Sequence, residues 1–358
     1  MKDDKLILAI NPGSTSTKIG VYRGMEPLLE KTLRHSAAQL EVFDRLIDQF
    51  DFRKEAVLEC LKEGGIDMRE IAVIMGRGGV LKPVKSGIFE INQAMLHDLK
   101  VNTLRVHASN LGGLIAHELA RTLPGARAFI VDPVVVDELE DVARISGHPL
   151  FERASIFHAL NQKATARQHA EKTGRRYEDL NLVVAHMGGG VSVGAHRKGR
   201  IVDVNQALDG EGPLSPERSG TLPSGALAAL CFSGKYTHEE VKKMITGRGG
   251  FIAHLGTNNA AEVEERSRTD AKVKLIRDAM IYQVAKEIGA MAVVLEGKID
   301  AILLTGGIAH SETFIGDLKA KISFLAPIYV YPGENEIFAL AYNGARILRG
   351  EAEIMEYV

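Results

Sequence analysis

Two stretches far apart in the chain, residues 6–22 and 182–196, follow one pattern of apolar strand, glycine-containing turn and second apolar strand. The first reads LILAINPGSTSTKIGVY and the second reads LVVAHMGGGVSVGAH. A third glycine turn follows the apolar strand 301–304, in LLTGGIAHSE. Glycine lets a backbone approach a ligand closely, and hydroxyls and a lysine add donors and positive charge. Three such turns predict a shared site for the phosphates and nucleoside of a nucleotide, whereas one turn alone is equally typical of a tight hairpin.

Composition excludes several other classes of function. A net charge of −2 over 358 residues gives no electrostatic case for binding nucleic acid or an anionic membrane. The two cysteines, Cys60 and Cys231, form neither a disulfide framework nor a metal-binding pattern. The apolar segment 280–295 is interrupted by Lys286 and Glu287, which indicates a buried helix and not a membrane span. We therefore expect a cytoplasmic protein that acts on small molecules.

Strand-like and helical patterns alternate along the chain, which is typical of an α/β protein. The hairpins at 6–22 and 182–196 each open a similar succession of hairpin, further strands and helices. This repetition predicts two halves of one architecture, residues 1–153 and 154–337, with the C-terminal helix, about 338–358, returning to the first half. Strands are expected near 6–10, 19–22, 71–75, 127–131, 182–186, 191–195, 201–204, 301–304 and 328–331, and helices near 36–49, 52–64, 111–123, 137–145, 158–173, 224–232, 238–246, 270–297 and 336–349.

An ordered set of motifs resembles the acetate and butyrate kinases, the acetokinase family of the actin, Hsp70 and sugar-kinase superfamily. The details STSTK, MGGGVSVGAH and SPERSGTLP are more similar to butyrate kinases than to acetate kinases. The resemblance implies two similar ribonuclease-H-like (actin/Hsp70-type) domains with the active site in the cleft between them. The motifs are NPGSTSTK, GRGG at 76–79, HASN at 107–110, IVDP at 130–133, FHALN at 157–161, HMGGG at 186–190, ERSGTLPSG at 217–225 and TGGIAHSE at 305–312.

The resemblance implies a kinase that transfers a phosphoryl group reversibly and in line between ATP and a short-chain carboxylate, butyrate or a branched acid. The products are an acyl phosphate and ADP, the cofactors are ATP/ADP and Mg²⁺, and the enzyme is expected to be a homo-oligomer, a dimer or larger. A carboxyl group with a pKa of about 4.3 is ionised at neutral pH, so no strong general base is needed. The site must instead supply positive charge to two anions, for which the planar fork of arginine is well suited.

The catalytic residues carried over from the resemblance come from five motifs. Arg77 and Arg218 match the arginines that hold the carboxylate and the moving phosphoryl group. His158 matches the histidine that stabilises that group in flight, and His107 matches a second cleft histidine. Asp132 matches the aspartate that orients an arginine or the metal assembly. His186 and His196, which flank the second hairpin, are interpreted as structural.

The resemblance also implies residues for the nucleotide and the metal. Asn11 and Glu336 match the metal-linked positions, with Glu334 as the alternative to Glu336. Two departures affect the nucleotide: the acetate kinases carry Asn in place of Gly189, and other members carry Asp and Arg where this chain has Asn259 and Ala261, which removes a stacking surface for adenine. The nucleotide-binding residues are Asn11, Ser14, Ser16, Lys18, Gly188, Gly189, Gly190, Asn259, Gly306, Gly307 and Ile308.

The acyl pocket is expected to include Gly79, Val106 and Phe157. Acetate kinases carry a branched residue at the position of Gly79, so its loss predicts room for a longer acyl tail. Each buried CH₂ contributes roughly 0.8 kcal/mol, which favours butyrate over acetate. The alternative is that Gly79 serves only the backbone of a turn.

Three other functions remain possible at this stage. The chain could be an acetate or propionate kinase, an ATPase switch like actin or Hsp70, or a sugar kinase. A switch needs acidic or glutamine groups to activate water, and the chain has no room for a separate peptide-binding domain. A sugar kinase favours Asp in place of Asn11, although Asp132 is a candidate base for a hydroxyl.

Overall fold

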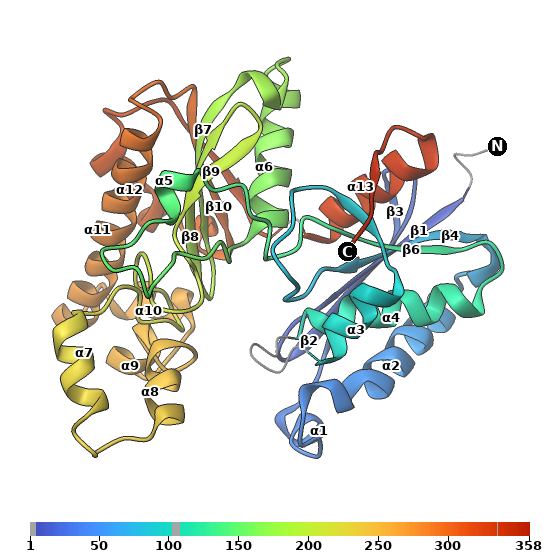
Figure 1. Ribbon diagram of the computed structural model, residues 1–358, viewed down its shortest axis with the longest axis horizontal. Coiled ribbons are helices and arrows are strands. Elements are labelled where there is room, and N and C mark those ends of the chain that lie inside the picture. The colour runs from blue at the N-terminus through green and yellow to red at the C-terminus, as the bar shows by residue number, and fades with distance from the viewer. Residues whose placement is uncertain (1–4, 102–107, 335) are drawn as a thin grey trace. The chain divides into compact units, whose positions relative to one another are not determined.

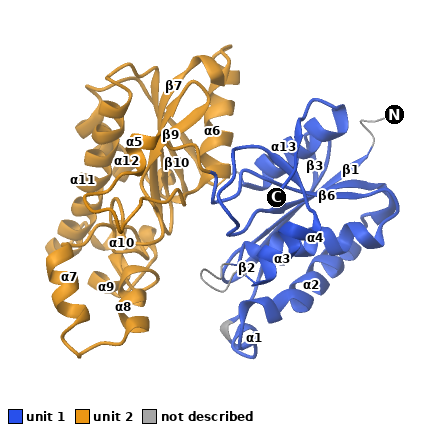
Figure 2. Ribbon diagram, in the orientation of Figure 1, with its two compact units in different colours: residues 1–136, 335–358 blue, residues 137–334 orange. Residues whose placement is uncertain are grey.

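The computed structural model describes residues 5–101, 108–334 and 336–358 (Figure 1). It divides into two compact units, residues 1–136 with 335–358 and residues 137–334 (Figure 2). The domain boundaries expected from the sequence, 153/154 and about 338, stay predictions. Two expected site residues, Val106 and His107, lie outside the described residues.

Unit 1 is built on a mixed sheet whose strand order is β12-β5-β6-β4-β1-β2-β3. The hairpin β1–β2 is antiparallel, with Ile10 opposite Ile19, and β3 continues it antiparallel to β2. Strands β4 and β6 then add in parallel to β1. The strands are β1 (Leu6–Pro12), β2 (Ser16–Arg23), β3 (Glu26–Arg34), β4 (Ile71–Arg77), β5 (Ile88–Glu90), β6 (Arg127–Val131) and β12 (Ile354–Met355).

Helices cover the sheet of unit 1 because its central strands are apolar on both faces. Leu8 and Ile10 join the core formed with Leu111 and Ile115 of α4. Ile7 points the other way, against α13, where a Cβ on Gly344 would lie 2.5 Å from its Cγ2. This alternation is the two-residue period of a strand. The helices are α1 (Ala37–Leu40), η1 (Leu46–Gln49), α2 (Phe50–Glu63), η2 (Met68–Glu70), α3 (Gln93–Val101), α4 (Asn110–Thr122) and α13 (Glu336–Arg349).

Unit 2 has a five-stranded sheet in the order β11-β10-β7-β8-β9. Strands β7, β8 and β9 are antiparallel neighbours, and β10 and β11 add in parallel to β7. The strands are β7 (Asn181–Met187), β8 (Val191–Arg197), β9 (Arg200–Val204), β10 (Ala301–Gly306) and β11 (Ile328–Pro332).

Helices also pack on both faces of the sheet in unit 2. Val183 contributes to the core with Val284 and Ile288 of α11, whereas Val184 faces the core formed with Ala166 of α6. The helices are α5 (Asp141–Arg144), α6 (Ala159–Lys172), η3 (Tyr177–Asp179), α7 (Ser224–Cys231), α8 (His238–Ile245), α9 (Gly250–Leu255), α10 (Ala260–Arg266), α11 (Ala271–Val294), η4 (Gly307–His310) and α12 (Glu312–Ile322).

The two sheets share one topology. The order β3-β2-β1-β4-β6 in unit 1 and the order β9-β8-β7-β10-β11 in unit 2 have the same directions throughout. The internal repeat predicted from the two hairpins is therefore confirmed. Among the described helices, none combines the length and the apolar character needed to cross a membrane.

Candidate active site

The first glycine-containing turn joins β1 to β2 and is held by a buried arginine that the sequence did not single out. Arg53 of α2 has no exposed surface. Its guanidinium also contacts the side chain of Gln49, with Nη2 2.9 Å from Oε1. Burial lowers the pKa of Arg53. Its two terminal nitrogens donate to four acceptors at 2.9–3.2 Å, the carbonyl oxygens of Gly13, Ser14 and Ser16 and the hydroxyl of Thr17.

This arrangement turns the carbonyls of the turn toward α2. Ser14 is exposed and Ser16 and Lys18 are half-buried. A helical arginine looks like an ordinary surface charge in a sequence, because nothing near it in the chain shows that carbonyls converge on it.

Arg77, Asn11 and Glu336 form one buried cluster at the ends of β4 and β1 and the start of α13. The two terminal nitrogens of Arg77 donate to the two oxygens of Glu336, at 2.8 and 2.9 Å. Arg77 Nη1 also lies 3.2 Å from Asn11 Oδ1, and Asn11 Nδ2 donates to Glu336 Oε2. Residues 11, 77 and 336, distant in the chain, are thus brought together by the parallel pairing of β1 with β4.

The same cluster has donors that suit a hard cation. Mg²⁺ is usually bound by one or two carboxylates or other oxygens together with substrate phosphates. The Glu336 carboxylate and the Asn11 amide oxygen are such groups and are buried side by side. Glu334 belongs to unit 2, where its Oε1 lies 3.8 Å from Nε2 of His186. Among the described residues, no group of three or more His, Cys, Asp or Glu side chains converges on one point.

Asp132 follows β6 in a backbone conformation that only a few residues tolerate. Its φ is 38°, in the left-handed region, although it is not a glycine. The side chain is buried, and its Oδ1 accepts from Ser86 Oγ at 2.6 Å and from the Gly87 amide at 3.0 Å. Backbone strain of this kind is concentrated at functional sites, which makes Asp132 a good candidate.

Gly79 has no open space beside it. A Cβ at this position would lie 2.6 Å from Cα of Asn110, the first residue of α4. Asn110 Oδ1 accepts a hydrogen bond of 2.8 Å from the amide of Val80 in the same place. The close approach of helix α4 is therefore sufficient to require glycine, which is a different reason from the backbone angles of a turn, and the idea that the missing side chain opens space is not supported.

In unit 2, the glycine turn after β7 packs against the segment that carries Arg218. The amide of Glu217 donates to the carbonyl of Gly189 at 3.2 Å, and Ser215 Oγ donates to the same oxygen at 2.7 Å. A Cβ on Gly190 would lie 2.5 Å from Cζ of Arg218. A side chain at Gly190 would displace the guanidinium from its place over the turn. The turn at 188–190 and Arg218, predicted from separate motifs, are neighbours.

His158 and His186 are stacked, with ring centroids 3.8 Å apart and an angle of 14° between the rings. His158 immediately precedes α6, and its Nδ1 lies 2.9 Å from Ser192 Oγ. His186 is buried in β7 and its Nδ1 lies 2.8 Å from Asn161 Oδ1. Phe157 is also buried here. The sequence predicts a structural role for His186, and the stacking places this ring against His158, a predicted catalytic side chain.

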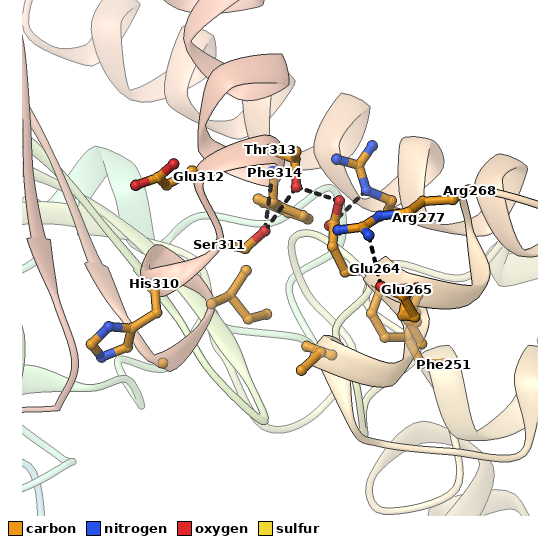
Figure 3. A pocket seen from close by; sticks show the side chains of 15 residues that line it. Phe251, Glu264, Glu265, Arg268, Arg277, His310, Ser311, Glu312, Thr313 and Phe314 are labelled. Carbon is orange, nitrogen blue, oxygen red and sulfur yellow. Dashed lines mark hydrogen bonds and ion pairs between the residues drawn. The ribbon is translucent and has the colours of Figure 1, made fainter.

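The third glycine turn lines a pocket in unit 2 with a volume of about 440 Å³ (Figure 3). Gly306 ends β10 with a φ of 93°, and a Cβ there would lie 2.6 Å from the carbonyl carbon of Met187. Gly307 and Ile308 follow and belong to the wall of the pocket, as does Ala261. Asn259 instead caps α10, accepting from the amides of Ala261 and Glu262.

The far wall of this pocket is charged. Arg277, almost fully buried, pairs with Glu264 at 2.8 Å (Figure 3). It also pairs with Asp317 at 2.7 Å. Burial alone would lower the pKa of Arg277, but its hydrogen bonds to Glu264 and Asp317 raise it. Arg268 pairs with Glu265 at 2.9 Å in the same wall, so the wall offers both donors and acceptors.

Solved structures of an acetate kinase and a propionate kinase have this fold. An acetate kinase from Porphyromonas gingivalis superposes with a TM-score of 0.76 at 18% identity, covering 96% of this chain and 100% of that one. A propionate kinase from Francisella tularensis gives 0.75 at 18% identity, covering 94% and 98%. Both confirm the predicted fold, an α/β protein with two similar ribonuclease-H-like domains.

Full-length relatives narrow the class. The profile of the acetokinase family matches residues 150–326. Butyrate kinase 2 and butyrate kinase 1 of Clostridium acetobutylicum are each 54% identical to the chain over 352 residues, 98% of this chain and 99% of each relative. A probable butyrate kinase of Bacteroides thetaiotaomicron is 55% identical over the same coverage. The chain belongs to the acetokinase family.

Proposed function

We propose that the chain acts as a butyrate kinase, which transfers a phosphoryl group between ATP and a short-chain carboxylate. The observation that carries this proposal is the identity of 54% with two butyrate kinases over almost their whole length. In the forward direction a carboxylate oxygen attacks the γ-phosphorus of ATP. The new O–P bond forms as the bond to the β,γ-bridging oxygen breaks, and the products are the acyl phosphate and ADP. No proton has to move, because the attacking carboxylate is already ionised.

Each unit contributes one set of groups to this reaction. In unit 1, Arg77 serves the carboxylate and the transferred phosphoryl group, and Asp132 orients an arginine or the metal assembly. Ser14, Ser16 and Lys18 face phosphate. In unit 2, Arg218, His158 and the turn at 188–190 stabilise the phosphoryl oxygens. The packing of Arg218 over Gly190 supports this assignment, because a fixed guanidinium beside backbone amides needs little reorganisation when charge develops.

The pocket at Gly307 and Ile308 takes the adenosine of ATP. Its volume of about 440 Å³ is within the range of small-molecule sites. With Ala261 in place of arginine, recognition of the base depends on the Arg277 and Glu264 wall and not on stacking. The base preference is therefore best measured directly, with ATP, GTP and ITP in parallel.

Mg²⁺ would be held by Asn11 and Glu336 together with the phosphates of the nucleotide, and it would neutralise charge on those phosphates. Arg77 pairs with both oxygens of Glu336, so the guanidinium has to share that carboxylate with the ion. Glu336 is preferred over Glu334 because it is buried beside Asn11. The acyl tail is assigned to Phe157 and Val106, and Gly79 is left out of this assignment because helix α4 fills the space beside it. A homo-oligomeric assembly and a cytoplasmic location complete the proposal.

The direct test is formation of acyl phosphate, trapped with hydroxylamine as the hydroxamate. Purified full-length chain is incubated with ATP, Mg²⁺ and acetate, propionate, butyrate, isobutyrate or valerate. We expect the highest kcat/KM with butyrate or isobutyrate. Preference for acetate or propionate would contradict the assigned substrate, and ADP release with no hydroxamate from any acid would indicate an ATPase instead.

A further inference from the structure

His158 lies at the end of a buried chain of hydrogen bonds within unit 2. The chain runs from His158 through Ser192, Gln162 and His196 to Tyr177. Ser192, Gln162 and His196 have no exposed surface, and Tyr177 is buried. The successive distances are 2.9, 2.8, 3.0 and 2.7 Å. Such a chain can fix where each proton lies, because buried polar groups need partners.

The amide of Gln162 sets the direction of the chain. Its Nε2 lies 3.1 Å from the backbone carbonyl of Ser192, which can only accept a hydrogen bond. Nε2 is therefore the donor end, and Oε1 faces Nε2 of His196, which must carry a proton. Burial lowers the pKa of His196 well below its usual range, so the ring is neutral. Its Nδ1 then accepts from the hydroxyl of Tyr177.

The directions of the hydrogen bonds between Gln162 and His158 follow in the same way. The second hydrogen of Gln162 Nε2 points to Ser192 Oγ, which accepts it. The hydrogen of that hydroxyl is then directed at Nδ1 of His158, since leaving it unpaired in a buried site costs free energy. A neutral His158 that accepts at Nδ1 carries its proton on Nε2.

The backbone makes room for this arrangement at Gly194 in β8. A Cβ at that position would lie 2.5 Å from Oε1 of Gln162 and 3.4 Å from Nε2 of His196. The amide could not keep its orientation beside a larger residue. This glycine is mid-strand, where glycine is unfavourable, so close packing against the network is a physical reason for it.

We propose that Ser192, Gln162 and His196 are positioning residues that hold His158 as the neutral tautomer with its proton on Nε2. The inference rests on the proposed role of His158 in phosphoryl transfer. With Nδ1 bonded to Ser192, Nε2 is the nitrogen that would meet the phosphoryl oxygens. A proton there donates to developing negative charge, whereas the opposite tautomer would direct a lone pair at it.

The first test measures the tautomer in the unmodified protein. Full-length chain labelled with ¹⁵N at histidine gives long-range proton–nitrogen correlations for each ring, and the His158→Asn variant assigns the signals of His158. We expect protonation at Nε2 of His158 and at Nε2 of His196. Protonation of neutral His158 at Nδ1 would overturn the proposal, and this measurement needs no variant in the network to fold.

The second test removes the hydrogen bond from Ser192 to His158. Ser192→Ala removes the donor to Nδ1, so we expect a mixture of tautomers and a kcat about tenfold lower, with the KM for ATP unchanged. Ser192→Cys has a weak donor of similar size, so its kcat and its mixture of tautomers should lie between those of the unmodified protein and of Ser192→Ala. Tyr331→Phe is the matched control, because it removes a 2.9 Å hydrogen bond to His169, which lies on the same helix, α6, but outside the hydrogen-bond network of His158. An unchanged His158 tautomer in both Ser192 variants would overturn the proposal.

Turnover of His158→Asn separates this inference from the proposed function. If that variant keeps normal turnover, the role of His158 in phosphoryl transfer is wrong, and the positioning proposal fails with it whatever the tautomer. If turnover falls but the tautomer does not respond to Ser192, the role of His158 stands and only the positioning residues are wrong.

Discussion

At the scale of single residues, Arg53 shows how a buried charge can shape the turn that we propose binds phosphate. We expect Arg53→Met to lower the free energy of unfolding by about 1–3 kcal/mol, because it leaves buried acceptors without a donor. The KM for ATP should rise more than kcat falls, since the turn at 11–18 loses its shape. Urea unfolding and steady-state kinetics measure both effects. Arg69→Met is the control, as that side chain is 86% exposed, and equal behaviour of the two variants would contradict the assignment.

Removal of the two proposed catalytic arginines tests their roles in transfer. Arg77→Ala and Arg218→Ala should each lower kcat by about 10²–10³, the typical cost of losing one donor aimed at developing charge. Arg77→Ala also takes the guanidinium away from the buried carboxylate of Glu336, which typically costs about 3–5 kcal/mol of stability. Thermal unfolding beside turnover separates the effects, and the double variant Arg77→Ala/Glu336→Gln should recover stability without activity. Near-normal turnover of Arg218→Ala would show that its assigned role is wrong.

Gly79 gives a second contrast between sequence and structure. Because α4 fills the space beside it, we expect Gly79→Val to reduce activity with acetate and butyrate alike and to lower the melting temperature. The hydroxamate assay with both acids, run beside thermal unfolding, checks this. Selective loss of butyrate activity at unchanged stability would restore the acyl-pocket interpretation.

At the scale of elements, the glycine turn after β10 separates folding from binding. Gly306 has a positive φ and a Cβ there meets backbone of Met187, so Gly306→Ala should destabilise the protein. Gly307, beside it, has nothing within 4 Å of the position of a Cβ, so Gly307→Ala should fold normally. If the backbone here lies close to a nucleotide, Gly307→Ala should raise the KM for ATP. Unchanged KM in a stable Gly307→Ala protein would place the nucleotide elsewhere.

Central strands and capped helices could be predicted from sequence because their signals are local. The helix expected near 238–246 is present as α8 (His238–Ile245), and Thr237 and Glu240 form a capping box at its start. The edge strand β3, rich in charged residues, was missed because pairing with β2 decides it and not its composition. The helix expected at 36–49 is instead a short helix, α1, and a 3₁₀ turn, η1.

The candidate site likewise contains residues that could be predicted from the sequence and residues that could not. The resemblance to the acetokinase family supplied Arg77 and Arg218, whereas the glycine turns are local patterns that are visible in the chain itself. Neither gave Arg53, the stacking of His186 on His158, or the network through Gln162. Those depend on contacts between residues distant in sequence, which no local pattern contains. The predicted family and fold are confirmed by the relatives and the solved structures.

At the scale of the whole molecule, the repeat of one five-strand topology explains the order of the motifs. Each unit places a glycine-containing turn between its first two strands, β1 and β2 in one and β7 and β8 in the other. Equivalent turns on equivalent sheets are a simple way to present two sets of phosphate-binding groups. We therefore infer that groups from both units serve the transfer of a phosphoryl group to a carboxylate.

The most direct test of this claim follows the phosphorus itself. ³¹P NMR of full-length chain with ATP, Mg²⁺ and butyrate should show the γ-phosphate signal replaced by an acyl phosphate signal as ADP appears. Arg77→Ala in unit 1 and Arg218→Ala in unit 2 should each suppress that signal. Appearance of inorganic phosphate as the first product, or undiminished acyl phosphate in either variant, would contradict the account.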